Sequence, residues 1–496
     1  MMQMKITRMI NILFVLSFYF ISVLAFSKIV QLSPLAAFLL IPACVVFLIY
    51  IKKRQLGIAN RSDSFCDRVW IGIWFLSFVM MIYMAFQLQV TTVGTWDWGH
   101  LIRVAGGYVL SGELQSKIYF ARYPNNQFWL CCLILLFKVV KYIYPSADMW
   151  TFTEVSMLLG CVCVALTLMF LYSTARILWG GRKALLTGIT AVLFAPLYMH
   201  AAFAYTDIPG MLVFMIITYL FVKYCREERR IKWSWLYIVA VGILSAVAWN
   251  IKITIFILII AIVITALLQM KNWKKLILGL LIAGVSFSVS FIFINMEKNH
   301  FFQFEDSYCD ANEFPPTHWL MMSLNFGGYV ADDVEYTASF PDYESKKEAN
   351  WEQIKERLKQ RGILGSLKYI LCDKQSGTWG DPTFAGTYVV SLAPLNPNGF
   401  WQRICTGEGD HHWILLLYSS LYYGFMLLGL LLSGIYNLNS KNQPLLAMRI
   451  ALIGIVLFLL IWECTSRYII VFFPALILLA CEGFIKFRSG QRKIKV

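Results

Sequence analysis

Long apolar segments recur along this chain and constrain its fold more than any other feature. A helix that crosses a membrane needs about 20 consecutive, mostly apolar residues. The composition agrees with such helices, since 59% of the 496 residues are hydrophobic and 14% are charged, against about 25% charged in soluble domains. We therefore predict an all-α polytopic membrane protein with a bundle of about 12 transmembrane helices. The segments lie at roughly 9–28, 33–51, 70–90, 152–175, 184–203, 207–223, 234–250, 252–270, 276–296, 413–436, 446–463 and 468–487.

One further apolar segment, 125–144, decides how the chain is threaded. Its start is polar and Lys138 and Lys141 follow soon after, so it is short for a span. If it does not cross, the basic clusters fall on the cytoplasmic side, as the positive-inside rule requires. We then expect a protein of the cell membrane with both termini in the cytoplasm and 125–144 along the outer face. The clusters are Lys52/Lys53/Arg54, Arg176/Arg182/Lys183, Lys223/Arg226/Arg229/Arg230, Lys271/Lys274/Lys275 and the tail 486–495.

This threading divides the chain into four regions. Residues 1–69 form a transmembrane hairpin and a cytoplasmic linker, and Lys5 and Arg8 precede an apolar run that we take as a retained first helix rather than a cleaved signal peptide. Residues 70–296 form a transmembrane module with an outer loop at 91–151. An extracytoplasmic loop at 297–412, with an amphipathic helix at 344–361, and C-terminal transmembrane helices with a basic tail at 413–496 complete the chain.

The net charge of +15 is explained by this topology. The loop 297–412 holds 10 Lys and Arg against 17 Asp and Glu, so the basic excess lies elsewhere, mostly in cytoplasmic loops. We therefore expect membrane lipids and no nucleic acid as partners. Most of the 12 cysteines lie in apolar runs, which excludes a disulfide framework.

Ionisable residues stand at helix ends on the predicted outer face. Asp97 lies between Trp96 and Trp98, where partial desolvation raises the basicity of a carboxylate and suits a general base. Interfacial loops also carry tryptophans commonly, and this interpretation is equally open. Asp207 precedes Pro209 in a short outer turn, where it can cap the following helix and still belong to a site.

Three cations lie on the same face. Arg122 stands just before Pro124, which starts a helix whose N-terminus would attract phosphate, although a simple turn is the alternative. Lys252, in a tight connection, either snorkels to the headgroups or binds an anionic group. Arg467 either pairs with Glu463, four residues before it, or binds an anionic ligand.

The large loop contributes His318-Trp319, which could bind a lipid phosphate or a sugar face, or simply form a packed corner. No HExxH or paired CxxC pattern is present, so the sequence indicates no metal site and no certain cofactor. Together, a carboxylate base and several cations on one face suit group transfer from a lipid-linked phosphate donor to a hydroxyl.

The ordered set of motifs resembles the GT-C superfamily of integral-membrane glycosyltransferases. The likeness is to the bacterial branch related to protein O-mannosyltransferases and to the aminoarabinose transferase of lipid A, and it covers roughly residues 70–487. The matching features are Asp97 in the first outer loop, Tyr123-Pro124 at the start of an amphipathic outer segment, Asp207 in a small loop, Lys252 at a helix start, and Glu463, Arg467-Tyr468 and Pro474 near the C-terminus.

The resemblance implies a polyprenyl-phosphate sugar donor of the undecaprenyl phosphate type and transfer with inversion to an extracytoplasmic glycan, a cell-wall polysaccharide or teichoic acid. Protein-mannosylating members usually carry two adjacent acids, whereas Trp98 follows Asp97 here, which argues against a protein acceptor. The implied roles are catalysis by Asp97 and Asp207, donor-phosphate binding by Lys252, Arg467 and Arg122, and substrate binding by Tyr123, Asn125, His318, Trp319, Glu463 and Tyr468.

Two other functions remain open from the sequence. Twelve spans with both ends inside are also common in transporters, although transporters often show repeated halves and ionisable residues at mid-membrane. A polymerase or ligase of lipid-linked oligosaccharides would share the donor chemistry.

Overall fold

The computed structural model describes residues 2–53, 62–93, 95–227, 234–269, 272–325, 327–440 and 442–490. Within these ranges the chain is helical, and its β-type pairing is limited to an isolated bridge between Val90 and Pro394. The all-α, polytopic fold class is therefore confirmed. Of the basic clusters used to thread the chain, Arg54, Arg229, Arg230, Lys271 and the tail beyond Gly490 lie outside the described residues.

The first half of the chain supplies most of the apolar helices. They are α1 (Met2–Leu32), α2 (Pro34–Lys53), α3 (Asp63–Gln87), α4 (Asp97–Ser111), α5 (Lys117–Arg122), the 3₁₀ turn η1 (Pro124–Asn126), α6 (Gln127–Ile143), α7 (Met149–Trp179), α8 (Gly181–Val192), α9 (Pro196–His200), α10 (Asp207–Glu227), α11 (Trp235–Ile251), η2 (Ile253–Ile255), α12 (Phe256–Gln269) and α13 (Trp273–Phe301).

The second half begins with short helices and ends with three long ones. They are α14 (Asp306–Asn312), α15 (Thr317–Ser323), α16 (Ala331–Ala338), α17 (Tyr343–Lys368), the π-helical turn η3 (Tyr369–Asp373), α18 (Lys374–Trp379), α19 (Gly386–Ser391), α20 (Phe400–Cys405), α21 (His412–Tyr436), α22 (Gln443–Ile461), η4 (Ser466–Phe472) and α23 (Phe473–Ser489).

Ten of the described helices are long and apolar enough to cross a membrane. Nine of them coincide with predicted spans: α1, α2, α3, α7, α10, α13, α21, α22 and the combined η4–α23. Two further predicted spans are α11 and the combined η2–α12, each of 17 residues. A 17-residue helix is about 25 Å long, close to the thickness of a bilayer core.

The predicted span at 184–203 is wrong as a single helix. Helix α8 ends at Val192 after 12 residues, and the separate α9 begins at Pro196. Proline has no backbone N–H, and its ring clashes with the carbonyl four residues earlier, so it ends or kinks a helix. Helix α8 alone is only about 18 Å long, shorter than a bilayer core, so α8, α9 and the residues that follow them together return the chain from the end beside Asp63 to the end beside Asp97.

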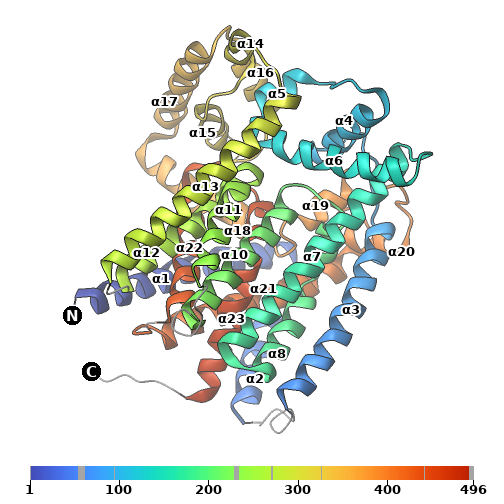
Figure 1. Ribbon diagram of the computed structural model, residues 1–496. Coiled ribbons are helices and arrows are strands. Elements are labelled where there is room, and N and C mark those ends of the chain that lie inside the picture. Colours follow the sequence, from blue (N-terminus) through green and yellow to red (C-terminus); the bar gives the residue numbers. More distant parts are fainter. Residues whose placement is uncertain are drawn as a thin grey trace.

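The tenth apolar helix is Pro124–Ile143, formed by η1 and α6, which we predict not to cross. It has the length and hydropathy of a span. In Figure 1, however, α6 lies across one end of the bundle, beside α4 and near the helices of the large loop. Helix α6 packs mainly against α4. This placement supports a helix on the membrane face rather than through it.

Helix α17 confirms the amphipathic helix predicted at 344–361. It extends to Lys368, but Gly362 has φ 66° and ψ 175° and interrupts the helical backbone. A positive φ is accessible to glycine because it has no Cβ. The first regular helix therefore ends where the sequence predicts. In Figure 1, α14 to α17 gather at the end of the bundle that also carries α4 to α6.

The N-terminal hairpin joins the C-terminal helices. Helix α1 packs against α21 and α22, and the Phe18 ring meets Trp379 of the large loop edge-on, with 5.7 Å between ring centroids. Beside α1, Arg449 of α22 and Glu482 of α23 form an ion pair in which both side chains are at most 1% exposed. The hairpin thus belongs to the same hydrophobic core as the rest of the bundle.

Candidate active site

The Asp97 carboxylate is held by two tyrosine hydroxyls. Asp97 is the first residue of α4. Its Oδ1 accepts a hydrogen bond from the Tyr119 hydroxyl at 2.7 Å, and its Oδ2 accepts one from the Tyr205 hydroxyl at 2.9 Å. The two tyrosines come from α5 and from the turn before α10, so three separate segments meet at this carboxylate.

Asn126 completes this carboxylate cluster. Its side-chain amide donates to the Tyr119 hydroxyl at 2.7 Å, and its carbonyl oxygen lies 3.2 Å from the Tyr205 hydroxyl. Burial, followed by the Asp97 charge, raises the pKa of both Tyr119 and Tyr205 well above the ordinary range. Both tyrosines therefore keep their protons and act as hydrogen-bond donors to the Asp97 carboxylate.

A second cluster is built on Asp207, the first residue of α10. Asp207 is 3% exposed and pairs with the Lys252 ammonium. Its Oδ2 lies 3.4 Å from Nε of Arg467. Two cations thus share one carboxylate, and this group of three side chains, the Asp207 triad, carries one excess positive charge.

The triad decides several alternatives left open by the sequence. Asp207 begins the helix rather than capping it, and its carboxylate pairs with cations. Lys252 is 11% exposed and points into the protein instead of snorkelling to the surface. Arg467 pairs with Asp207, whereas Glu463 accepts a hydrogen bond from the Tyr468 hydroxyl at 2.8 Å. The interactions across the fold therefore replace the local ones that the sequence spacing suggested.

Aromatic rings join the two clusters. The Lys252 ammonium lies 4.5 Å from the centroid of the Tyr468 ring. The Arg467 guanidinium lies 5.2 Å from the Tyr205 ring, whose hydroxyl bonds Asp97. Ring faces attract cations without neutralising them. The two rings thus position the cations without cancelling their charge.

Glu463 lies beside these cations, just beyond the end of α22. Burial raises the pKa of its carboxyl, while the Tyr468 hydroxyl and the Arg467 charge oppose that rise. Glu463 and Tyr468 therefore lie with Lys252 and Arg467, as the predicted site requires.

The remaining predicted residues lie against the large loop. The Arg122 guanidinium packs over the Phe314 ring, 4.6 Å from its centroid, rather than beside Asp207. The Tyr123 ring meets Phe314 and Trp319 edge-on at 6.0 and 6.5 Å. Trp319 in turn stacks on Trp462, the residue before Glu463, at 5.9 Å. We call Arg122, Tyr123, Phe314, His318 and Trp319 the outer aromatic cluster.

His318 occupies the interior of that cluster. It is 1% exposed, and its Nδ1 lies 2.8 Å from the Thr337 hydroxyl of α16. Burial lowers the pKa of His318 to about 4, so the ring is neutral at physiological pH. His318 therefore forms a packed corner, which is one of the interpretations that the sequence left open. Asn125 is exposed, and its amide donates to Asn126.

Three residues of the site escaped prediction: Tyr119, Tyr205 and Asn126. Each lies within a few residues of a predicted one, and Asn126 directly follows Asn125. Tyrosines are common at membrane interfaces, so the sequence carries no signal that separates these two from the others. Their selection depends on which segments the fold brings to Asp97.

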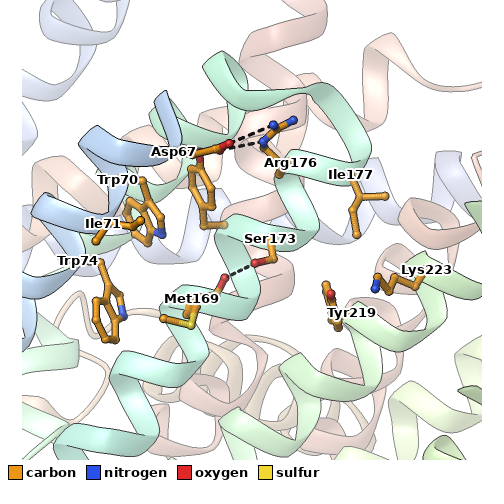
Figure 2. A pocket seen from close by; sticks show the side chains of 11 residues that line it. Asp67, Trp70, Ile71, Trp74, Met169, Ser173, Arg176, Ile177, Tyr219 and Lys223 are labelled. Atoms are coloured by element: carbon orange, nitrogen blue, oxygen red, sulfur yellow. Dashed lines mark hydrogen bonds and ion pairs between the residues drawn. The ribbon is translucent and has the colours of Figure 1, made fainter. Parts of the chain in front are cut away.

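Other features of the molecule lie apart from this site. Among the described residues, no group of three or more His, Cys, Asp or Glu could hold a metal ion. A cavity of about 590 Å³ is lined by α3, α7 and α10, with Asp67, Arg176 and Lys223 at its edge (Figure 2). Lys223 lies 16 residues after Asp207 on α10, about 24 Å along the helix. This cavity is therefore at the other end of the bundle.

Comparison with known proteins identifies the family. Residues 1–484 match the profile of a family described as "Conserved hypothetical integral membrane protein". The chain belongs to this family. It is a multi-pass membrane protein, in agreement with its ten apolar helices. No curated protein matches the sequence.

Similar solved structures include ArnT and AglB. ArnT from Cupriavidus metallidurans bound to undecaprenyl phosphate is 12% identical, with 84% of this chain and 77% of that chain covered and a TM-score of 0.37. The archaeal oligosaccharyltransferase AglB from Archaeoglobus fulgidus, in complex with an inhibitory peptide and a dolichol-phosphate, is 11% identical, with a TM-score of 0.40. The match covers 82% of this chain and 50% of AglB.

Proposed function

We propose that this protein transfers a sugar from a polyprenyl-phosphate donor, of the undecaprenyl phosphate type, to a hydroxyl of an extracytoplasmic glycan. The observation that carries the proposal is the contact between the two clusters: a carboxylate that accepts hydrogen bonds from two tyrosines lies next to a triad of two cations and one carboxylate. A general base and a phosphate-binding site are the two elements that such a transfer requires.

The reaction follows from the charges of these side chains. The Asp97 carboxylate takes the proton of the acceptor hydroxyl as the oxygen attacks the anomeric carbon, and the bond from that carbon to the phosphate oxygen breaks. The sugar is transferred with inversion. The departing polyprenyl phosphate gains one negative charge, which Lys252 and Arg467 stabilise. Asp207 keeps the two cations together before the donor binds.

The outer aromatic cluster has a place in this proposal on the acceptor side. It joins the start of η1 to the large loop and reaches Glu463 through Trp319 and Trp462. Aromatic faces suit a sugar, and we propose a cell-wall polysaccharide or teichoic acid as acceptor. Mass spectrometry of wall polymers from cells with and without the protein would identify the sugar and its acceptor, and unchanged polymers would contradict this choice.

Loss of the Lys252 charge should weaken donor binding. We expect Lys252→Gln to bind undecaprenyl phosphate about 10–100-fold more weakly, the effect of removing one hydrogen bond to a charged group. Binding is measured on the full chain in nanodiscs. Lys138→Gln, which alters an exposed lysine of α6 outside the triad, should bind as the wild type does. Equal binding of undecaprenol without its phosphate would contradict a phosphate site.

The proposed orientation places the site on the outer face. A cysteine introduced at the exposed Ser146, between α6 and α7, should react with a membrane-impermeant maleimide in whole cells. A cysteine at Ser489, near the end of α23, should react after permeabilisation only. The twelve native cysteines are buried or half-buried, so the wild type gives the background. Labelling of position 146 from the cytoplasm alone would reverse the orientation.

A further inference from the structure

Tyr205 contacts both clusters of the site. Its hydroxyl donates to Oδ2 of Asp97 at 2.9 Å, and its ring lies 5.2 Å from the Arg467 guanidinium. The side chain is 5% exposed. Tyr205 thus contacts the proposed base through its hydroxyl and a proposed phosphate-binding cation through its ring.

The backbone around Tyr205 leaves the ring little freedom. Its carbonyl accepts a hydrogen bond from the Ile208 N–H at 2.9 Å, and its N–H donates to the Phe203 carbonyl at 2.8 Å. Asp207, two residues later, begins α10 and pairs with Arg467. The turn therefore holds the Tyr205 ring and the Asp207 carboxylate, which pairs with Arg467, in one fixed arrangement.

Tyr119 provides a natural comparison because it has only one of these two contacts. Its hydroxyl donates to Oδ1 of Asp97 at 2.7 Å. Its ring lies 4.2 Å from the His100 ring and 5.1 Å from the Tyr123 ring. The two tyrosines thus serve the two oxygens of the same carboxylate, and Tyr205 in addition faces Arg467.

We infer that Tyr205 is a positioning residue that couples the orientation of the Asp97 carboxylate to that of the Arg467 guanidinium. This inference rests on the proposed function. The hydroxyl fixes the carboxylate so that its remaining lone pairs face the acceptor, while the ring fixes the guanidinium for the donor phosphate. A shift of Arg467 on phosphate binding is transmitted to the base through one rigid ring.

Separate removal of the hydroxyl and the ring tests this coupling. Tyr205→Phe keeps the ring, so undecaprenyl phosphate should bind within about twofold of the wild-type affinity, whereas sugar transfer should fall about tenfold or more. Tyr205→Met also removes the ring face, so binding of undecaprenyl phosphate should weaken about threefold or more as well. Transfer is measured as the sugar content of wall polymers in cells lacking their own copy.

Tyr119→Phe is the matched control. It removes a hydroxyl from the same carboxylate without touching Arg467, so transfer should fall while undecaprenyl phosphate binding stays unchanged. Thermal unfolding midpoints of the purified variants establish that each is folded. If Tyr205→Met does not fold, the comparison of the two phenylalanine variants still decides whether the hydroxyls position the base.

Two results would overturn the coupling: wild-type transfer by Tyr205→Phe, or the same undecaprenyl phosphate affinity in Tyr205→Met and Tyr205→Phe. Asp97→Asn separates this failure from failure of the proposed function. If Asp97→Asn transfers sugar normally, the proposed function is wrong. If Asp97→Asn is inactive and Tyr205→Phe is fully active, the coupling alone is wrong.

Discussion

Asp97→Asn should reduce sugar transfer about 10²–10⁴-fold, the contribution of a positioned general base. The asparagine has the same shape, and its carbonyl oxygen can still accept a hydrogen bond from one of the two tyrosines. Its amide can donate to the oxygen of the other tyrosine, because a hydroxyl also accepts. The variant therefore lacks the proton acceptor and should keep the fold.

The measurement is the sugar content of wall polymers in cells lacking their own copy and supplied with the variant. The thermal unfolding midpoint and the amount of protein in the membrane should match those of the wild type. Asp332→Asn, at an exposed position of α16, is the control and should transfer sugar normally. Normal transfer by Asp97→Asn with a normal amount of protein would remove Asp97 from catalysis.

Arg449→Leu should lower the free energy of unfolding by about 3–5 kcal/mol, the cost of breaking a buried ion pair by removing one partner. Glu482, on the neighbouring helix, would lose its cationic partner. The Ser433 hydroxyl donates to Glu482 at 2.7 Å and accepts from Arg449 at 3.0 Å, so the pair also ties α21 to α22 and α23. The loss of stability should therefore affect α21, α22 and α23 together.

The double variant Arg449→Leu/Glu482→Leu separates a lost pair from an unpaired charge. Because apolar residues often replace a buried pair without loss, it should be more stable than Arg449→Leu alone. Unfolding in detergent by denaturant gives both free energies, and undecaprenyl phosphate binding by the double variant should remain as in the wild type. A double variant less stable than the single one would mean that the cost is lost packing rather than an uncompensated charge.

The apolar pattern predicted most of the helices because the bilayer imposes one length on them. Eight predicted spans are single long helices, a ninth is the combined η4–α23, and the helix predicted at 344–361 ends at Gly362, where the backbone leaves the helical region. The span at 184–203 failed because Pro196 interrupts an apolar run that hydropathy alone cannot divide. Hydropathy measures the free energy of transferring side chains to lipid. It does not detect that proline lacks a backbone N–H donor.

The candidate site was predicted in part. The sequence places Asp207, Lys252 and Arg467 at the ends of apolar helices on one face of the membrane, and the fold brings them into contact. Arg122 was grouped with them because it also precedes a helix start, but it packs on Phe314 of the large loop. Residues that lie at the same depth in the membrane need not contact one another.

By itself, the sequence determined that this chain is a helical membrane protein with ionisable residues at its helix ends, because burial of charge in lipid is costly wherever it occurs along the chain. The tertiary structure alone decided which of these charges meet. Lys252 lies 45 residues from Asp207, and Tyr205 lies 108 residues from Asp97. Such contacts depend on how the helices pack side by side, and no local spacing encodes that arrangement.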